Sequence, residues 1–145
     1  MVAVKTHGAL PPPVLAALLV FILSLSACGG GSDPVPDLFG TWEWVGTSGG
    51  ITGDSRTPRP EDPVITVRFA SGGTAVFSRD GEVAREQRYR LSSEVTIFGP
   101  EALPVLYFDD EDMGRVVRIE DSGTTLTLSD NVNDGFALQY RRVTE

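Results

Sequence analysis

The chain has 145 residues, 41% of them hydrophobic and 22% charged, and its formal net charge is −8. This length suits one globular domain, and the acidic balance excludes the basic surface that nucleic-acid binding needs. Its single Lys, His and Cys are Lys5, His7 and Cys28. If the first 28 residues are a targeting segment, the folded part has no imidazole, amine or free thiol side chain. That excludes Ser-His-Asp catalysis and zinc sites built from His and Cys.

The first 27 residues have the pattern of a secretory signal peptide. Lys5 supplies a positive start, Val14–Leu23 is an unbroken apolar run, and small residues follow it. A membrane-spanning helix needs about 20 apolar residues, whereas this run has 10 and Pro11-Pro12-Pro13 precedes it. We therefore predict a signal peptide over residues 1–27 that is removed from the mature protein.

The end of this segment, Leu25-Ser26-Ala27-Cys28, resembles the lipobox of bacterial lipoproteins. The resemblance implies that Cys28 becomes the new N-terminus and carries thioether-linked diacylglycerol and an amide-linked fatty acid such as palmitate. Two or more acyl chains anchor a protein stably, whereas one does so only marginally. The resemblance thus implies a lipid-anchored protein of the bacterial cell envelope. Gly29 after the Cys resembles the outer-membrane sorting pattern, with the protein facing the periplasm or the cell surface.

Residues 28–36 form the expected linker, rich in Gly, Ser and Pro, and residues 37–145 form the expected domain. The domain contains nine short runs rich in Val, Ile, Thr and aromatic residues, which are typical of strands. They are residues 39–45, 64–70, 74–79, 83–91, 95–98, 105–108, 115–120, 124–128 and 136–143. Turn residues such as Asp80-Gly81, Ser92-Ser93 and Asp134-Gly135 separate them.

No window in the domain shows the apolar period of a helix. Regularly spaced strands favour an all-β fold, namely an antiparallel up-and-down β-barrel of about eight strands, because closure removes exposed strand edges. A β-sandwich is the alternative.

Three short motifs resemble lipocalins, in particular the lipocalin-like lipoproteins of bacteria. They are the Gly40-Thr41-Trp42 opening, the loop Ser48–Gly53 with the prolines after it, and the tail from Leu126 to Arg142. The resemblance implies a lipocalin-like domain in which Trp42 plugs the closed end of the barrel. It further implies that Arg141 or Arg142 packs over the Trp42 ring through a cation–π contact.

Motifs for chemistry are weak in this sequence. The Gly-rich segment Gly46–Gly53 lacks the Lys of a P-loop. Asp130–Gly135 departs from a calcium loop, because Val132 occupies a ligand position and Arg141 stands where the bidentate Glu belongs. The acidic run Asp109–Asp112 reads as a solvated loop. We therefore expect no enzyme activity, no metal and no cofactor, with an enzyme that uses carboxylates alone as the remote alternative.

The sequence leaves two principal hypotheses for function. Trp44 shares a strand face with Trp42, so Trp44 and Tyr140 either belong to a packed core or line a ligand cavity. The first hypothesis is a membrane-anchored binding module for a small apolar ligand, which predicts a cavity of several hundred Å³. The second is a protein-interaction role, as inhibitor of an exported hydrolase or as envelope assembly factor, which predicts a filled barrel with an exposed apolar patch.

Overall fold

The structure is a computed structural model, and it describes residues 36–144. The expected signal peptide and lipidation site lie outside the described residues. The described part contains nine strands and one 3₁₀ turn. They are β1 (Gly40–Gly49), β2 (Asp54–Arg56), β3 (Ile65–Ala70), β4 (Thr74–Arg79), β5 (Glu82–Thr96), β6 (Gly99–Phe108), β7 (Arg115–Glu120), η1 (Asp121–Gly123), β8 (Thr125–Asp130) and β9 (Phe136–Arg142).

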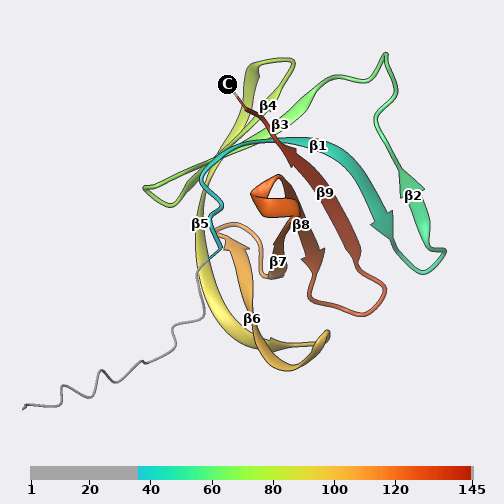
Figure 1. Cartoon of the computed structure of the whole chain (residues 1–145), viewed down its shortest axis with the longest axis vertical. Helices are drawn as coiled ribbons and strands as arrows, with labels where there is room; N and C mark the ends of the chain where they lie inside the picture. Colours follow the sequence, from blue (N-terminus) through green and yellow to red (C-terminus); the bar gives the residue numbers. More distant parts are fainter. Residues whose placement is uncertain (1–35, 145) are drawn as a thin grey trace, which may run out of the picture. The chain divides into compact units, whose positions relative to one another are not determined.

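The strands form a closed antiparallel barrel (Figure 1). Neighbours in the sheet follow the chain order from β3 to β9, and β1 pairs with both β3 and β9. Eight strands therefore close the barrel, and β2 is an extra strand on the last three residues of β1. This confirms the all-β prediction and the barrel in preference to a sandwich. Among residues 36–144 no helix has the length and apolar character to cross a membrane.

Local chemistry sets the tight connection between β4 and β5. Asp80 and Gly81 both have positive φ angles, 51° and 81°, and Arg79 pairs directly with Glu82 on either side of them. A two-residue hairpin needs positive φ at both positions, which Asp tolerates and Gly adopts freely. The sequence prediction of a turn here is confirmed.

The hairpin of β5 and β6 departs from the sequence prediction. Ser92 and Ser93, predicted as a turn, lie inside β5 opposite Val105 and Pro104. That prediction was wrong because the strand pairing continues through these small polar residues, and the chain reverses only at Ile97-Phe98. Figure 1 shows β5 and β6 as the long, curved pair of the barrel.

The same hairpin bends over the outside of the barrel. Its strand pairing with β7 comprises only two residue pairs, one of which joins Val105 to Val116. Both side chains point away from the barrel interior, because their neighbours Leu106 and Val117 point into it, yet both are fully buried. The hairpin tip is fixed where the Ile97 N–H donates to Asn131 Oδ1 at 3.1 Å.

The barrel interior forms one apolar core. Its buried members come from every strand of the closed barrel except β5, and half-buried Tyr89 and Leu91 of β5 pack against it. The fully buried side chains of this core include Trp42, Phe69 and Leu126. The core thus fills the end of the barrel that contains Trp42, and the remaining space lies toward the opposite end.

Candidate functional site

Trp42 and Arg142 close one end of the barrel. The Trp42 indole is fully buried and donates its Nε1–H to the Leu38 carbonyl at 2.8 Å. The guanidinium carbon of Arg142 lies 4.1 Å from the centroid of the Trp42 ring. Arg142 also donates to three backbone carbonyls, those of Gly123 at 2.7 Å, Phe39 at 2.6 Å and Asp37 at 2.9 Å. These contacts join four segments of the chain.

Arg141 faces outward and does not contact Trp42. Its side chain is 65% exposed and pairs with Glu43 at 3.4 Å. The register explains the difference, because Trp42 is opposite Arg142 and Glu43 is opposite Arg141. Gly40 leaves room for this arrangement: its φ is +110°, and a Cβ there would lie 3.1 Å from a guanidinium nitrogen of Arg142.

The barrel mouth at the other end contains a cavity of about 100 Å³. Seven of its lining residues are apolar or aromatic, and Arg85, Glu111 and Arg115 form a charged rim. The seven are Val67, Phe69, Phe77, Phe108, Leu128, Leu138 and Tyr140. The site therefore combines apolar walls with a polar entrance, which is the usual composition of small-molecule pockets.

Trp44 and Tyr140, for which the sequence leaves a packed core or a ligand cavity open, both belong to the apolar core. Trp44 and Tyr140 are direct partners across β1 and β9, but only Tyr140 lines the interior cavity. The Trp44 indole is buried and donates to Thr47 Oγ1 at 3.0 Å. It lines a separate depression of about 320 Å³ beneath the proline-containing loop 58–65.

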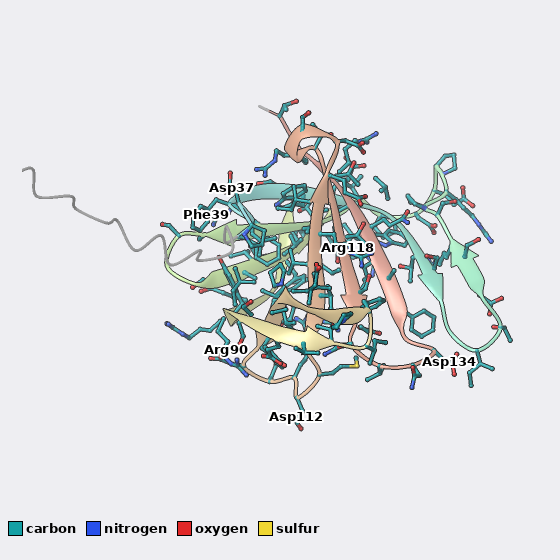
Figure 2. The ribbon with its side chains drawn as sticks, turned by 60° about the horizontal axis from the view of Figure 1, so that its bottom comes forward. Asp37, Phe39, Arg90, Asp112, Arg118 and Asp134 are labelled. Carbon is teal, nitrogen blue, oxygen red and sulfur yellow. The ribbon has the colours of Figure 1, made fainter. Side chains whose placement is uncertain are left out.

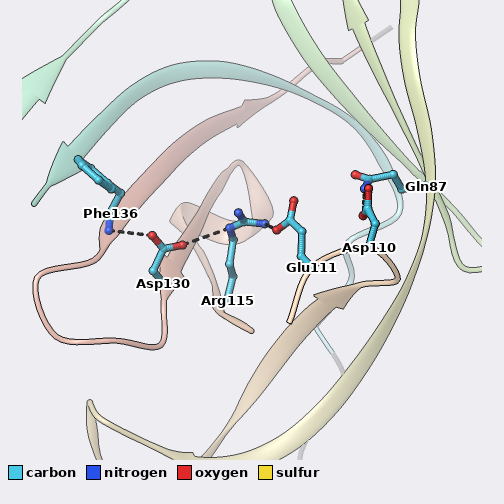
Figure 3. Close-up of polar contacts among 6 residues, drawn as sticks. All are labelled: Gln87, Asp110, Glu111, Arg115, Asp130 and Phe136. Atoms are coloured by element: carbon cyan, nitrogen blue, oxygen red, sulfur yellow. Dashed lines mark hydrogen bonds and ion pairs between the residues drawn. The ribbon is translucent and has the colours of Figure 1, made fainter. Parts of the chain in front are cut away.

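Arg115 organises the rim through a chain of polar contacts (Figure 3). It pairs with Glu111 at 2.5 Å and, through Nε, with Asp130 at 3.2 Å. Asp130 in turn accepts the Phe136 backbone N–H at 3.0 Å, which ties β8 to the first residue of β9. The geometry fixes the Arg115 side chain at the cavity entrance.

The acidic loop between β6 and β7 is part of this rim rather than purely solvated. Asp110 accepts a hydrogen bond from the Gln87 side-chain amide, and Glu111 binds Arg115. Sequence reasoning missed Arg85, Glu111 and Arg115. Two features of the sequence could have identified these rim residues. They are the four-residue spacing from Glu111 to Arg115 and the period-2 alternation that puts Arg85 and Gln87 on one face of β5.

Tyr140 stays protonated in its surroundings. Burial raises the pKa of its hydroxyl to about 12, against smaller lowering effects of Arg115 and Arg85. Tyr140 lines the same cavity as Arg85, Glu111 and Arg115. At neutral pH Tyr140 is therefore a hydrogen-bond donor next to the cavity, and not an anion.

Other site types receive no support within the described residues. From Pro36 to Thr144, no group of three or more acidic, His or Cys side chains is arranged to hold a metal ion. Comparison with protein-family models, with curated proteins and with solved structures finds no match for this chain. The candidate functional site is the interior cavity, which has apolar walls and a charged rim.

Proposed function

We propose that the protein is a membrane-tethered, lipocalin-like and non-catalytic binding module that holds a small apolar group in the mouth of its barrel. The observation that carries this proposal is the interior cavity, with seven apolar or aromatic lining residues behind a charged rim. The absence of His, Lys and Cys from residues 29–145 supports a binding role over nucleophilic catalysis.

The interior cavity of about 100 Å³ is smaller than the several hundred Å³ that the sequence-based hypothesis predicts, and its size restricts the ligand. Drug-sized ligands occupy roughly 300–1,000 Å³, and an engineered cavity of about 150 Å³ holds benzene. The cavity of about 100 Å³ suits a smaller group, such as a short alkyl chain or the end of a longer one. Whole sterols and haem are too large for the interior of this barrel.

Two probes of matching size test the binding site. In ¹⁵N-NMR spectra of the full chain in detergent, xenon and hexanoate should shift the amide signals of Phe69, Phe108 and Tyr140. Leu138→Phe fills the cavity and should abolish these shifts. Leu103→Phe is the matched control, since Leu103 lies on the β5–β6 hairpin and does not line the cavity. Interior signals unmoved by both probes would contradict the proposal.

A separate experiment tests the proposed lipid anchor on Cys28. When the chain is expressed in a Gram-negative bacterium, the mature protein should begin at Cys28 and carry the mass of three acyl chains. It should sediment with membranes, whereas Cys28→Ser should be released from them. An uncleaved precursor, or equal membrane association of both proteins, would refute the lipoprotein assignment and leave the cavity proposal standing.

A further inference from the structure

A further depression, which we call the outer groove, lies outside the barrel and has a volume of about 310 Å³. Four apolar side chains line it: Ile97 and Phe98 from the β5–β6 turn, Val132 from the β8–β9 turn, and Phe136 at the start of β9. Each is between 43% and 51% exposed, and none belongs to the barrel core. These four side chains therefore contribute neither to the core nor to the lining of the interior cavity.

The floor of the outer groove consists of small side chains on three adjacent strands. Ser129 of β8 pairs with Ala137 of β9, and Ala137 pairs with Ser48 of β1. Because directly opposite residues point to the same face, these three side chains form a continuous row. The row lets a side chain from another molecule approach the sheet closely between the four apolar residues.

The walls of the outer groove are held by specific contacts. Asn131 fixes the β5–β6 tip through Ile97, as described above, and the Arg118 guanidinium lies 5.4 Å from the Phe98 ring. On the other side the Phe136 ring lies so close to Gly50 that an added Cβ there would be 3.0 Å from Phe136 Cζ, and the Gly50 N–H donates to the Gly135 carbonyl at 3.1 Å. Contacts among the β5–β6, β8–β9 and β1–β2 connections therefore hold the walls of the outer groove in place.

The charged residues that line the outer groove are both acidic, whereas the Arg118 guanidinium lies on the Phe98 ring at one wall. Asp130 and Asp134 are the charged residues among its lining, and Asp130 is neutralised by Arg115. Asp134 lies in the β8–β9 turn, far from the closed end of the barrel, where Asp37 and Phe39 lie (Figure 2). Asp54 is paired with Gly49 next to the groove, and the chain as a whole has a net charge of −8.

We propose that the outer groove docks a segment of a partner protein in which an apolar side chain is flanked by Lys or Arg. The apolar walls and small-residue floor accept the side chain, and the acidic surroundings attract the flanking cations. The same charges repel a bilayer rich in anionic lipid and a second copy of this acidic chain. This inference is independent of ligand binding inside the barrel.

Fluorescent peptides test the proposal by polarisation with the full chain in detergent. The probe has one phenylalanine between two pairs of lysines. One control replaces the phenylalanine by alanine, and another replaces the lysines by glutamates. Only the first peptide should bind. Val132→Ser and Phe136→Ser should each weaken its binding roughly tenfold. Val83→Ser is the control for a surface valine elsewhere, because Val83 is 67% exposed and does not line the groove.

Several outcomes would overturn the proposal. Equal binding of the alanine peptide would show attraction by charge alone, and equal binding of the glutamate peptide would show an unselective apolar surface. Unchanged binding by both Val132→Ser and Phe136→Ser would place the peptide elsewhere. A concentration-dependent dimer, or vesicles of phosphatidylglycerol that compete for the groove, would identify a different occupant. Leu138→Phe should leave peptide binding intact, which separates this proposal from the interior site.

Discussion

Arg142 spans the closed end of the barrel from above the Trp42 ring, with its guanidinium carbon 4.1 Å from the ring centroid. Its donors reach the carbonyls of Asp37 and Phe39, which precede β1, and of Gly123, which precedes β8. One side chain therefore satisfies three backbone acceptors and covers the largest buried ring. This makes Arg142 a structural residue of the barrel rather than a ligand-binding one.

Arg142→Met should destabilise the protein by about 3 kcal/mol, because hydrogen bonds from a charged donor and the cation–π contact are lost together. Arg142→Lys should cost less, since it keeps the charge but not the planar fork. Arg141→Met is the matched control and should cost less than about 1 kcal/mol, as an exposed ion pair contributes little. Urea unfolding followed by Trp fluorescence measures all three. Equal losses for Arg141→Met and Arg142→Met would contradict this role.

The sequence leaves open which of these two Arg residues meets Trp42, and the reason is physical. Alternation puts Arg142 on the apolar face of β9 with Leu138 and Tyr140, and Arg141 on the other face, but it does not show which β9 residue lies opposite Trp42. The register of β1 against β9 decides, and that register shifts between Trp44 and Gly46. Gly46 is compatible with such an irregularity, but tertiary packing decides whether it forms and how it sets the register.

Most strands are predictable from sequence because they combine β-branched alternation with explicit turns. β2 was missed since its three residues are all exposed and show no apolar alternation. The outer groove was missed for another reason. The groove forms because the β5–β6 turn with Ile97 and Phe98 lies against the β8–β9 turn, and period-2 patterning predicts only an inside and an outside.

Tyr140 should make the protein less stable at alkaline pH. Its pKa is about 12 in the folded state against 10.0 for the free side chain. The unfolded chain therefore loses this proton first, so the full stability present below pH 10 falls as the pH rises toward 12. The loss is about 3 kcal/mol. Urea unfolding at pH 8, 10 and 11.5 measures it.

Tyr140→Phe is the control for this pH dependence, because it keeps the ring and removes the ionisable group. The variant should lose clearly less stability than the natural protein between pH 10 and 12. An ultraviolet titration of the folded protein should also show one phenol group fewer above pH 11. Identical alkaline loss in both proteins would exclude Tyr140 as its source.

Asp130 should be the more sensitive of the two carboxylates that bind Arg115 at the cavity rim. Asp130→Ala removes the acceptor of both Arg115 and the Phe136 N–H, and the loss of such buried partners costs about 2–3 kcal/mol. Asp130→Asn keeps a neutral acceptor and should cost less. Glu111→Ala is the comparison, because Arg115 then retains Asp130. Thermal unfolding and amide exchange at Phe136 measure the effects. Faster exchange in Glu111→Ala than in Asp130→Ala would contradict this order.

Gly49 should tolerate no side chain, because two separate constraints act on it. Its φ of +125° lies in the region that favours glycine, and an added Cβ would overlap the Gly135 backbone carbonyl of the β8–β9 turn. Gly53 also has a positive φ, +66°, but a Cβ there meets nothing within 4 Å. Gly53→Ala should therefore cost about 1 kcal/mol from backbone strain alone. Gly49→Ala should cost at least twice as much in urea unfolding, and it should shift the amide signals around Gly135. Equal losses in the two variants would show that the close approach of β1 to this turn adds nothing to the strain.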